Sequence, residues 1–202
     1  MDTFRNRSVR ARIENHFIQT ILNGTSSNVC PMKKDEKSLL SIIEGYQKEA
    51  EKCRGANAYL AGCVMLGAAL EASLLAMAKC YTEEVEQTKT FSSKKEPNLD
   101  KWNLIDHLKV ARELNWIPSK LWLDKIARES GIDPDEALKN GDLGYFADVV
   151  REIRDMLHPG RYLRLWSGVK VTKKFLETSY EVVDLIRESL LKKLEDSIRQ
   201  EM

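Results

Sequence analysis

The chain has 202 residues, 43% hydrophobic and 31% charged, which is typical of a soluble globular protein built from one ordinary domain. Its 32 Lys and Arg residues almost balance its 31 Asp and Glu residues, so the overall charge indicates neither a nucleic-acid-binding protein nor a membrane-surface protein. The first residues are polar and basic rather than apolar, so we expect no secretory signal peptide.

The cysteines bear on metal binding and on the redox compartment. Four of them lie far apart, without a CxxC pair and without two nearby histidines: Cys30, Cys53, Cys63 and Cys80. Zinc sites are usually built from such close pairs. The sequence also lacks a glycine-rich phosphate loop, a Ser-His-Asp pattern and an HExxH helix. We therefore expect no bound metal, no cofactor and a reducing, cytoplasmic location.

The chain opens with a basic amphipathic segment. A helical pattern covers about residues 3–23 and ends at Asn23-Gly24, a typical helix stop that precedes a polar linker. Four arginines of this segment face a single acid: Arg5, Arg7, Arg10 and Arg12. We interpret residues 1–34 as an N-terminal helical arm with its linker, and residues 35–202 as the main domain. Such basic runs are usually solvated surface, with RNA contact as the alternative.

Two helices are expected next. Residues 35–53 carry Leu39, Ile42, Ile43 and Tyr46 at helical spacing. From Gly55 to Ala78 the chain is apolar in every direction, and Glu71 is its only acidic or basic residue. This stretch is long enough to span a bilayer. Its central carboxylate and its many small residues favour a buried helix at the centre of a bundle instead, so we expect no membrane segment.

Helical patterns continue to the end of the chain, and strand signals are almost absent. Residues 82–97 are charged and rich in Ser and Lys, which predicts a mobile loop. Further helices are expected at about 98–117, from Pro118 to Gly131, from Leu143 to Leu157 and at 170–200. The sequence therefore predicts an all-α protein, an up-and-down helical bundle with an additional N-terminal helical arm.

The helix expected around 143–158 carries the candidate site. On a helical wheel its apolar residues share one sector, with Arg154 inside the sector and Arg151 and His158 together at its edge. Charge at such a position is costly unless it is paired or functional. The alternative is a simple helix end, because His158 suits the last turn and Gly160 suits the stop.

The spacing of Arg151 and His158 resembles the Arg-x4–6-His signature of the HEPN superfamily (higher eukaryotes and prokaryotes nucleotide-binding domains). The run VVREIRDMLHPGRYLR is similar to the Arg-x-x-Arg-Asn-x-x-His-Pro form of many bacterial members. The apolar helix of the family resembles YLAGCVMLGAALEASLLAMA, with Gly67 and Glu71 as its Gly-x-x-x-Glu. The helix that often lies between this apolar helix and the motif helix is similar to WNLIDHLKVARELNWIP. Only three residues separate Arg154 from His158, so the identity of the motif arginine stays open.

The resemblance implies a bundle that forms a homodimer and brings two motif copies into one cleft. It implies a metal-independent endoribonuclease of the toxin or phage-defence type, with Arg151 and His158 as the catalytic pair. Arg154, Arg161 and Glu71 would support the site or bind phosphate. RNA as substrate and an antitoxin-like partner protein belong to the same expectation. The alternative is a non-catalytic interaction module, or one that binds nucleotide or RNA, with the same fold.

Glu71 needs a partner if it is buried, because an isolated carboxylate in apolar surroundings is strongly disfavoured. Arg154 is the best candidate, since it alone of the motif cations points into the apolar sector and its guanidinium can bind a carboxylate through two hydrogen bonds. His107 is expected at the edge of the core. The tryptophans are expected in the core or at the dimer interface: Trp102, Trp116, Trp122 and Trp166.

Overall fold

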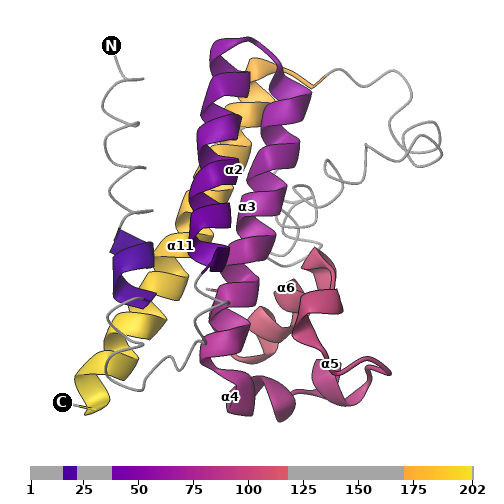
Figure 1. The fold of residues 1–202 in the computed structure, drawn as a ribbon, viewed down its shortest axis with the longest axis vertical. Helices are drawn as coiled ribbons and strands as arrows, with labels where there is room; N and C mark the ends of the chain where they lie inside the picture. Colours follow the sequence, from indigo (N-terminus) through magenta and orange to yellow (C-terminus); the bar gives the residue numbers. More distant parts are fainter. Residues whose placement is uncertain (1–15, 22–37, 118–170, 202) are drawn as a thin grey trace, which may run out of the picture.

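The structure, a computed structural model, describes residues 16–21, 38–117 and 171–201 (Figure 1). These residues contain helices and no strand, which confirms the predicted all-α bundle. The elements are α2 (Ser38–Gly55), α3 (Tyr59–Cys80), α4 (Thr82–Glu86), α5 (Lys89–Ser92), the 3-10 helix η1 (Leu99–Lys101), α6 (Leu104–Glu113) and α11 (Lys173–Glu201). The helices expected from Pro118 to Gly131 and from Leu143 to Leu157 lie outside the described residues.

The helices α2 and α3 form an antiparallel hairpin, as an up-and-down bundle requires (Figure 1). The turn between them depends on Asn57, whose φ of 58° lies in the left-handed region that asparagine tolerates better than most residues. The backbone N–H of Ala58 donates to the carbonyl of Cys53 at 2.8 Å, and the Tyr59 hydroxyl donates to the Asn57 side chain at 2.7 Å. These two bonds close the turn and direct α3 back along α2.

The helix α3 is buried on most of its sides. Fourteen of its 22 residues are buried, among them the small side chains that alternate with leucines and methionines. In the part of the chain that the structure describes, α3 is the one helix long and apolar enough to cross a membrane, and 67% of its most apolar window is buried inside the protein. The central, buried position predicted for this stretch is therefore observed.

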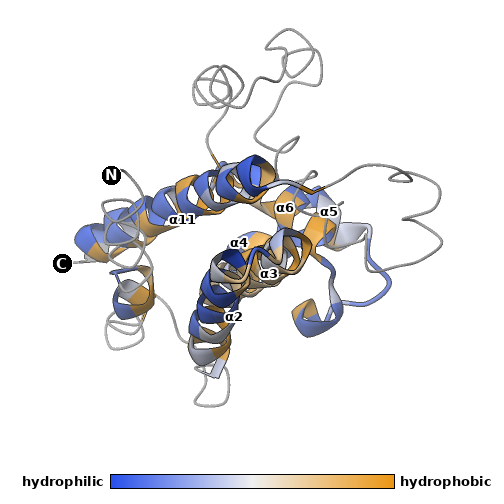
Figure 2. Ribbon diagram, turned by 90° about the horizontal axis from the view of Figure 1, so that it is seen from above, coloured by the Kyte–Doolittle hydropathy of each residue, from blue (hydrophilic) through white to orange (hydrophobic). Residues whose placement is uncertain are grey.

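The long helix α11 runs parallel to α3 and antiparallel to α2 (Figure 1). Side-chain contacts follow the same order along α3 and α11: Cys63 with Ser179, Ser73 with Arg187, and Tyr81 with Ser197. The order is reversed along α2, where Gln47 contacts Arg187 and Arg54 contacts Glu177. Figure 2 shows α11 along one side of the α2–α3 hairpin, and both α2 and α11 carry polar as well as apolar residues, whereas α3 is mostly apolar.

Arg187 of α11 lies between the three long helices and is only 1% exposed. Its Nε donates a hydrogen bond to the Ser73 hydroxyl of α3 at 3.2 Å, and its Nη1 donates to the Gln47 side-chain oxygen of α2 at 2.8 Å. The Ser73 hydroxyl donates to the carbonyl of Ala69 at 2.8 Å. One guanidinium group therefore joins all three helices. Hydrogen bonds are directional and apolar contacts are not, so this network fixes the position of each helix along its axis relative to the other two.

A short helical segment of the predicted N-terminal arm, residues 16–21, belongs to the same core. Phe17 and Ile21 are fully buried, and Ile18 is 4% exposed. The imidazole Nε2 of His16 lies 2.7 Å from a carboxylate oxygen of Glu195, near the end of α11. Figure 1 shows this segment beside the C-terminal part of α11. Part of the arm therefore packs on the bundle, and the remaining residues of 1–34 lie outside the described residues.

We predict that replacing Gln47 with leucine lowers the free energy of unfolding by about 1–3 kcal/mol, because the substitution removes a hydrogen-bond acceptor from the buried Arg187. Urea denaturation of the variant and the parent measures this difference. Lys48→Leu places the same side chain at the exposed neighbouring position and should change stability by about 0.5 kcal/mol or less. Equal effects of the two variants would contradict a structural role for the network.

Candidate functional site

The predicted site is divided between residues inside and outside the described part of the chain. Arg151, Arg154, His158 and Arg161 lie outside it. Glu71 lies inside it, near the middle of α3, with a half-buried side chain.

Glu71 is the acidic residue in a helix that is otherwise apolar around it. Residues one turn away on either side are small or aliphatic: Gly67, Ala68, Leu74 and Leu75. Glu71 and Ser73 are two positions apart, so their side chains leave the helix about 200° apart. Ser73 faces Arg187 and α11. Glu71 is therefore turned away from α11, and the expected contact with Arg154 falls outside the described residues.

The charged stretch after α3 is structured, so the prediction of a loop at 82–97 was wrong. It contains α4 and α5, and with η1 and α6 these elements form a compact unit below α3, residues 82–113, which we call the cap (Figure 1). The Thr88 hydroxyl caps α5 by accepting a hydrogen bond from the backbone N–H of Phe91 at 3.1 Å. The structure of this stretch depends on a residue that is distant in the sequence, Glu113 at the end of α6, which binds the first turn of α5.

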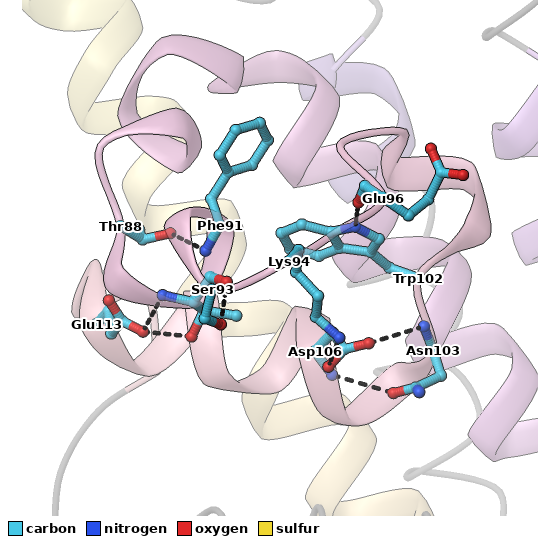
Figure 3. Close-up of polar contacts among 10 residues, drawn as sticks. Thr88, Phe91, Ser93, Lys94, Glu96, Trp102, Asn103, Asp106 and Glu113 are labelled. Atoms are coloured by element: carbon cyan, nitrogen blue, oxygen red, sulfur yellow. Dashed lines mark hydrogen bonds and ion pairs between the residues drawn. The ribbon is translucent and has the colours of Figure 1, made fainter.

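The carboxylate of Glu113 binds the first turn of α5 (Figure 3). It accepts hydrogen bonds from the backbone N–H of Lys89 at 2.7 Å, from the backbone N–H of Thr90 at 3.1 Å and from the Thr90 hydroxyl. Burial alone would raise the pKa of Glu113, but these hydrogen bonds outweigh it and lower the pKa below its usual value. The contact holds the start of α5 against the end of α6.

A second polar cluster lies at the start of α6 (Figure 3). The Asn103 side chain accepts from the backbone N–H of Asp106 at 3.2 Å, and the Asp106 carboxylate accepts from the backbone N–H of Asn103, so the two form a capping box. The same carboxylate, which is almost fully buried, lies 2.5 Å from the Lys94 ammonium. That ammonium also lies 5.6 Å from the centre of the Trp102 ring. The pair therefore ties the loop after α5 to α6.

His107 follows Asp106 and is 2% exposed, so the expectation of a side chain at the edge of the core was wrong. Its ring centre lies 5.8 Å from that of Trp102, and its Nδ1 has no hydrogen-bond partner among the described residues. Burial lowers the pKa of His107 to about 4. The negative charges of Asp106 and Asp100 act in the opposite direction and raise this pKa, whereas the positive charge of Lys94 lowers it further. The imidazole is thus neutral near pH 7.

The cap is therefore built as a structural unit. A neutral, buried imidazole does not supply a proton near neutral pH, and Trp102 and Trp116 are buried in the core as the sequence predicts, where they cannot stack on bases. The ion pair between Lys79 of α3 and Asp100 of η1, with 2.9 Å between charged atoms, attaches the cap to the central helix. Among the described residues, no group of three or more His, Cys, Asp and Glu side chains could hold a metal ion.

Comparison with known proteins adds no further assignment: no family model, no curated protein and no solved structure matches this chain. The arguments for function therefore come from the residues of the chain itself. The candidates that the sequence offers are the motif around Arg151 and His158, which lies outside the described residues, and the carboxylate of Glu71 on the central helix.

We predict a loss of stability between about pH 6.5 and pH 4 that depends on His107. Its pKa is lower in the folded protein than in the unfolded chain, so the unfolded chain binds the proton first as the pH falls. The stability is complete above about pH 6.5, and the loss approaches roughly 3 kcal/mol near pH 4. Urea denaturation across this range should show a shallower pH dependence for His107→Leu and for His107→Gln. An unchanged slope in a folded variant would contradict this account.

We also predict that Glu71 and Arg154 stabilise the protein as a pair. Glu71→Gln and Arg154→Met should each lower the free energy of unfolding because each removes one partner of the pair, and by less than the roughly 3–5 kcal/mol of a fully buried pair, since Glu71 is only half-buried. The double variant should recover part of the loss, since neither charge then remains. Thermal denaturation of the four proteins measures the coupling. Strictly additive losses would show that Glu71 depends on a different contact.

Proposed function

We propose that this chain is a HEPN-like, metal-independent endoribonuclease that cleaves RNA with Arg151 and His158 at the cleft of a homodimer. The observation that carries the proposal is the Arg151-x6-His158 pattern in a chain whose described part is an all-α bundle around one long apolar helix. The carboxylate of Glu71, half-buried at the middle of that helix, supports it as the expected anchor for the helix that bears the motif.

The residue types suit RNA cleavage without a metal. The reaction needs a group that accepts the proton of the 2′-hydroxyl, a group that donates a proton to the leaving 5′-oxygen, and positive charge near the phosphorus. The pKa of an ordinary histidine lies near neutrality, so His158 can take part in the proton transfers. Arg151 would hold the phosphate through the paired N–H groups of its guanidinium, and Arg161 would add a second contact.

Arg154 has a different role in this proposal. It would pair with Glu71 and hold the motif helix against α3, so that Arg151 and His158 keep their orientation. A cell that makes such a nuclease must restrain it, so an antitoxin-like protein is the expected partner and the cytoplasm the expected location. A non-catalytic module of the same fold would keep the Glu71 pair and lose the cleavage.

The activity is tested with purified protein and an RNA substrate in EDTA. We expect cleavage that leaves 2′,3′-cyclic phosphate ends, because the 2′-hydroxyl of the substrate is the nucleophile. His158→Ala should lower the rate about 10²–10⁴-fold, the usual effect of removing a general acid or base. Arg151→Ala should also abolish most cleavage, with an unchanged far-UV circular dichroism spectrum.

Arg164→Ala provides a matched control, since it removes an arginine from the same basic run outside the motif. It should retain most of the activity. Cleavage that survives in both motif variants would mean a contaminating nuclease or a different site. Absence of cleavage by the parent, with a stable Glu71–Arg154 pair, would favour the non-catalytic module.

A further inference from the structure

We propose that Cys80 forms a redox-sensitive disulfide with Cys30, which fastens the linker of the N-terminal arm to the central helix. Cys80 is the last residue of α3, and its sulfur is disulfide-bonded. Its partner lies outside the described residues, as Cys30 does. The proposal uses none of the residues of the proposed active site, so the two can be tested separately.

The two cysteines at the other positions of the hairpin cannot be the partner of Cys80. Both Cys53 and Cys63 have free thiols. Cys63 lies on the same helix as Cys80, about 26 Å away along its axis, whereas the Cα atoms of a disulfide lie within about 7 Å of each other. Cys53 lies at the opposite end of α3, where its carbonyl accepts a hydrogen bond from the backbone N–H of Ala58 at 2.8 Å. Of the four cysteines of the chain, Cys30 remains.

The chain after Cys30 leads to the end of the bundle where Cys80 lies. α2 begins at Ser38, and α2 and α3 are antiparallel neighbours, so the start of α2 lies beside the C-terminal half of α3 (Figure 1). The eight positions from Cys30 to Ser38 span at most about 26–29 Å when extended. Cys30 can therefore reach Cys80 from the start of α2.

The chain before Cys30 leads to the same end. The described segment of the arm lies 2.7 Å from the Glu195 carboxylate of α11. Two positions further along α11, the Ser197 hydroxyl accepts a hydrogen bond at 2.9 Å from Tyr81, the residue after Cys80. Both described segments that flank Cys30 are thus anchored at the end of the bundle that carries Cys80, so a bond between the two sulfurs fits the described fold.

Formation of this bond is a two-electron oxidation. The S–H bonds of Cys30 and Cys80 break, one S–S bond forms between the two sulfurs, and two protons and two electrons are released. A small disulfide such as oxidised glutathione accepts them and becomes two thiols. Disulfides in a reducing cytoplasm are usually transient and redox-sensing. The two thiols are therefore the expected state in that compartment, and the disulfide is the state under oxidising conditions.

Cys63 should not take part in this exchange. It is 1% exposed, and burial raises the pKa of its thiol to about 11. The thiolate is the form that attacks a disulfide, so this thiol stays protonated and unreactive near pH 7. Cys53 is only half-buried and is the free thiol whose role an experiment must control.

The disulfide has two physical consequences. It closes the chain between Cys30 and Cys80, which restricts the unfolded state and stabilises the folded one. It also shortens the chain between the described arm segment and the nearest anchor from residues 22–37 to residues 22–29, which is half the length. Because loop entropy grows with length, detachment of the arm segment becomes about threefold less frequent.

Peptide mapping of the full chain tests the pairing. The protein is treated with oxidised glutathione, its free thiols are alkylated, and it is digested with trypsin without reductant. We expect the peptides 13–33 and 80–89 to be joined by a disulfide and to separate in dithiothreitol. A different partner of Cys80, or alkylated thiols at both positions after the oxidation, would overturn the proposal.

Thermal denaturation with and without dithiothreitol tests the effect on the fold. The oxidised parent should melt about 5–10 °C above the reduced parent. Cys30→Ser should melt like the reduced parent under both conditions, because it cannot form the bond. Cys53→Ser changes a free cysteine, so it is the matched control and should keep the difference. A difference that persists in Cys30→Ser would contradict the assigned pair.

Hydrogen exchange of the arm segment tests the fastening itself. The backbone amides of residues 16–21 should exchange about threefold more slowly in the oxidised parent than in Cys30→Ser. Cys53→Ser, oxidised in the same way, should match the oxidised parent. Equal rates in the oxidised parent and in Cys30→Ser would show that this bond does not hold the arm on the bundle.

Discussion

The structure depends on the enclosure of α3. A helix that is apolar on almost every side is stable in water only if other elements cover it, and the burial of each large aliphatic side chain contributes about 1.5–3 kcal/mol. The neighbours divide this task along its length. α2 covers one side, α11 a second, and the cap covers the C-terminal end, where Lys79 is ion-paired with Asp100.

Apolar enclosure alone would not fix how the helices slide along one another. Polar side chains fix these axial positions at two places along the bundle. Arg187 joins all three long helices through Gln47 and Ser73, and Arg54 at the end of α2 lies 3.4 Å from Glu177 and 5.4 Å from the centre of the Tyr180 ring. Buried polar contacts of this kind are costly if one member is lost, so they select one register among the many that apolar packing tolerates.

The sequence predicts the helices well and their contacts poorly, for a physical reason. α3 and α11 begin and end within about four residues of the expected positions because their apolar periodicity is local information. On α2 the apolar spacing includes Ile42 and Tyr46, which the structure exposes, and it leaves out Gln47, which the structure buries. Gln47 is buried because Arg187 reaches it from a helix 140 residues away. The pattern of neighbouring residues in the sequence therefore does not predict this contact.

The cap shows the same limit, since α5 depends on the distant Glu113 carboxylate. The buried position of His107, likewise, goes with its packing against the ring of Trp102 and was not expected from its own helix pattern. Of the candidate site, the sequence identifies Glu71 as the carboxylate that interrupts the apolar helix, and the structure places it half-buried on the side away from α11. The roles of Arg151, Arg154, His158 and Arg161 stay predictions that rest on residue type and spacing.

Native-state hydrogen exchange tests the central claim, that the fold is organised around an enclosed α3. The backbone amides of α3 should exchange most slowly, with opening free energies equal to that of global unfolding, because no partial opening exposes a helix that is covered from several sides. The amides of α4 and α5 in the cap should exchange faster, through a smaller local opening. If the amides of α3 exchanged as fast as those of α5, α3 would not be the enclosed core of this protein.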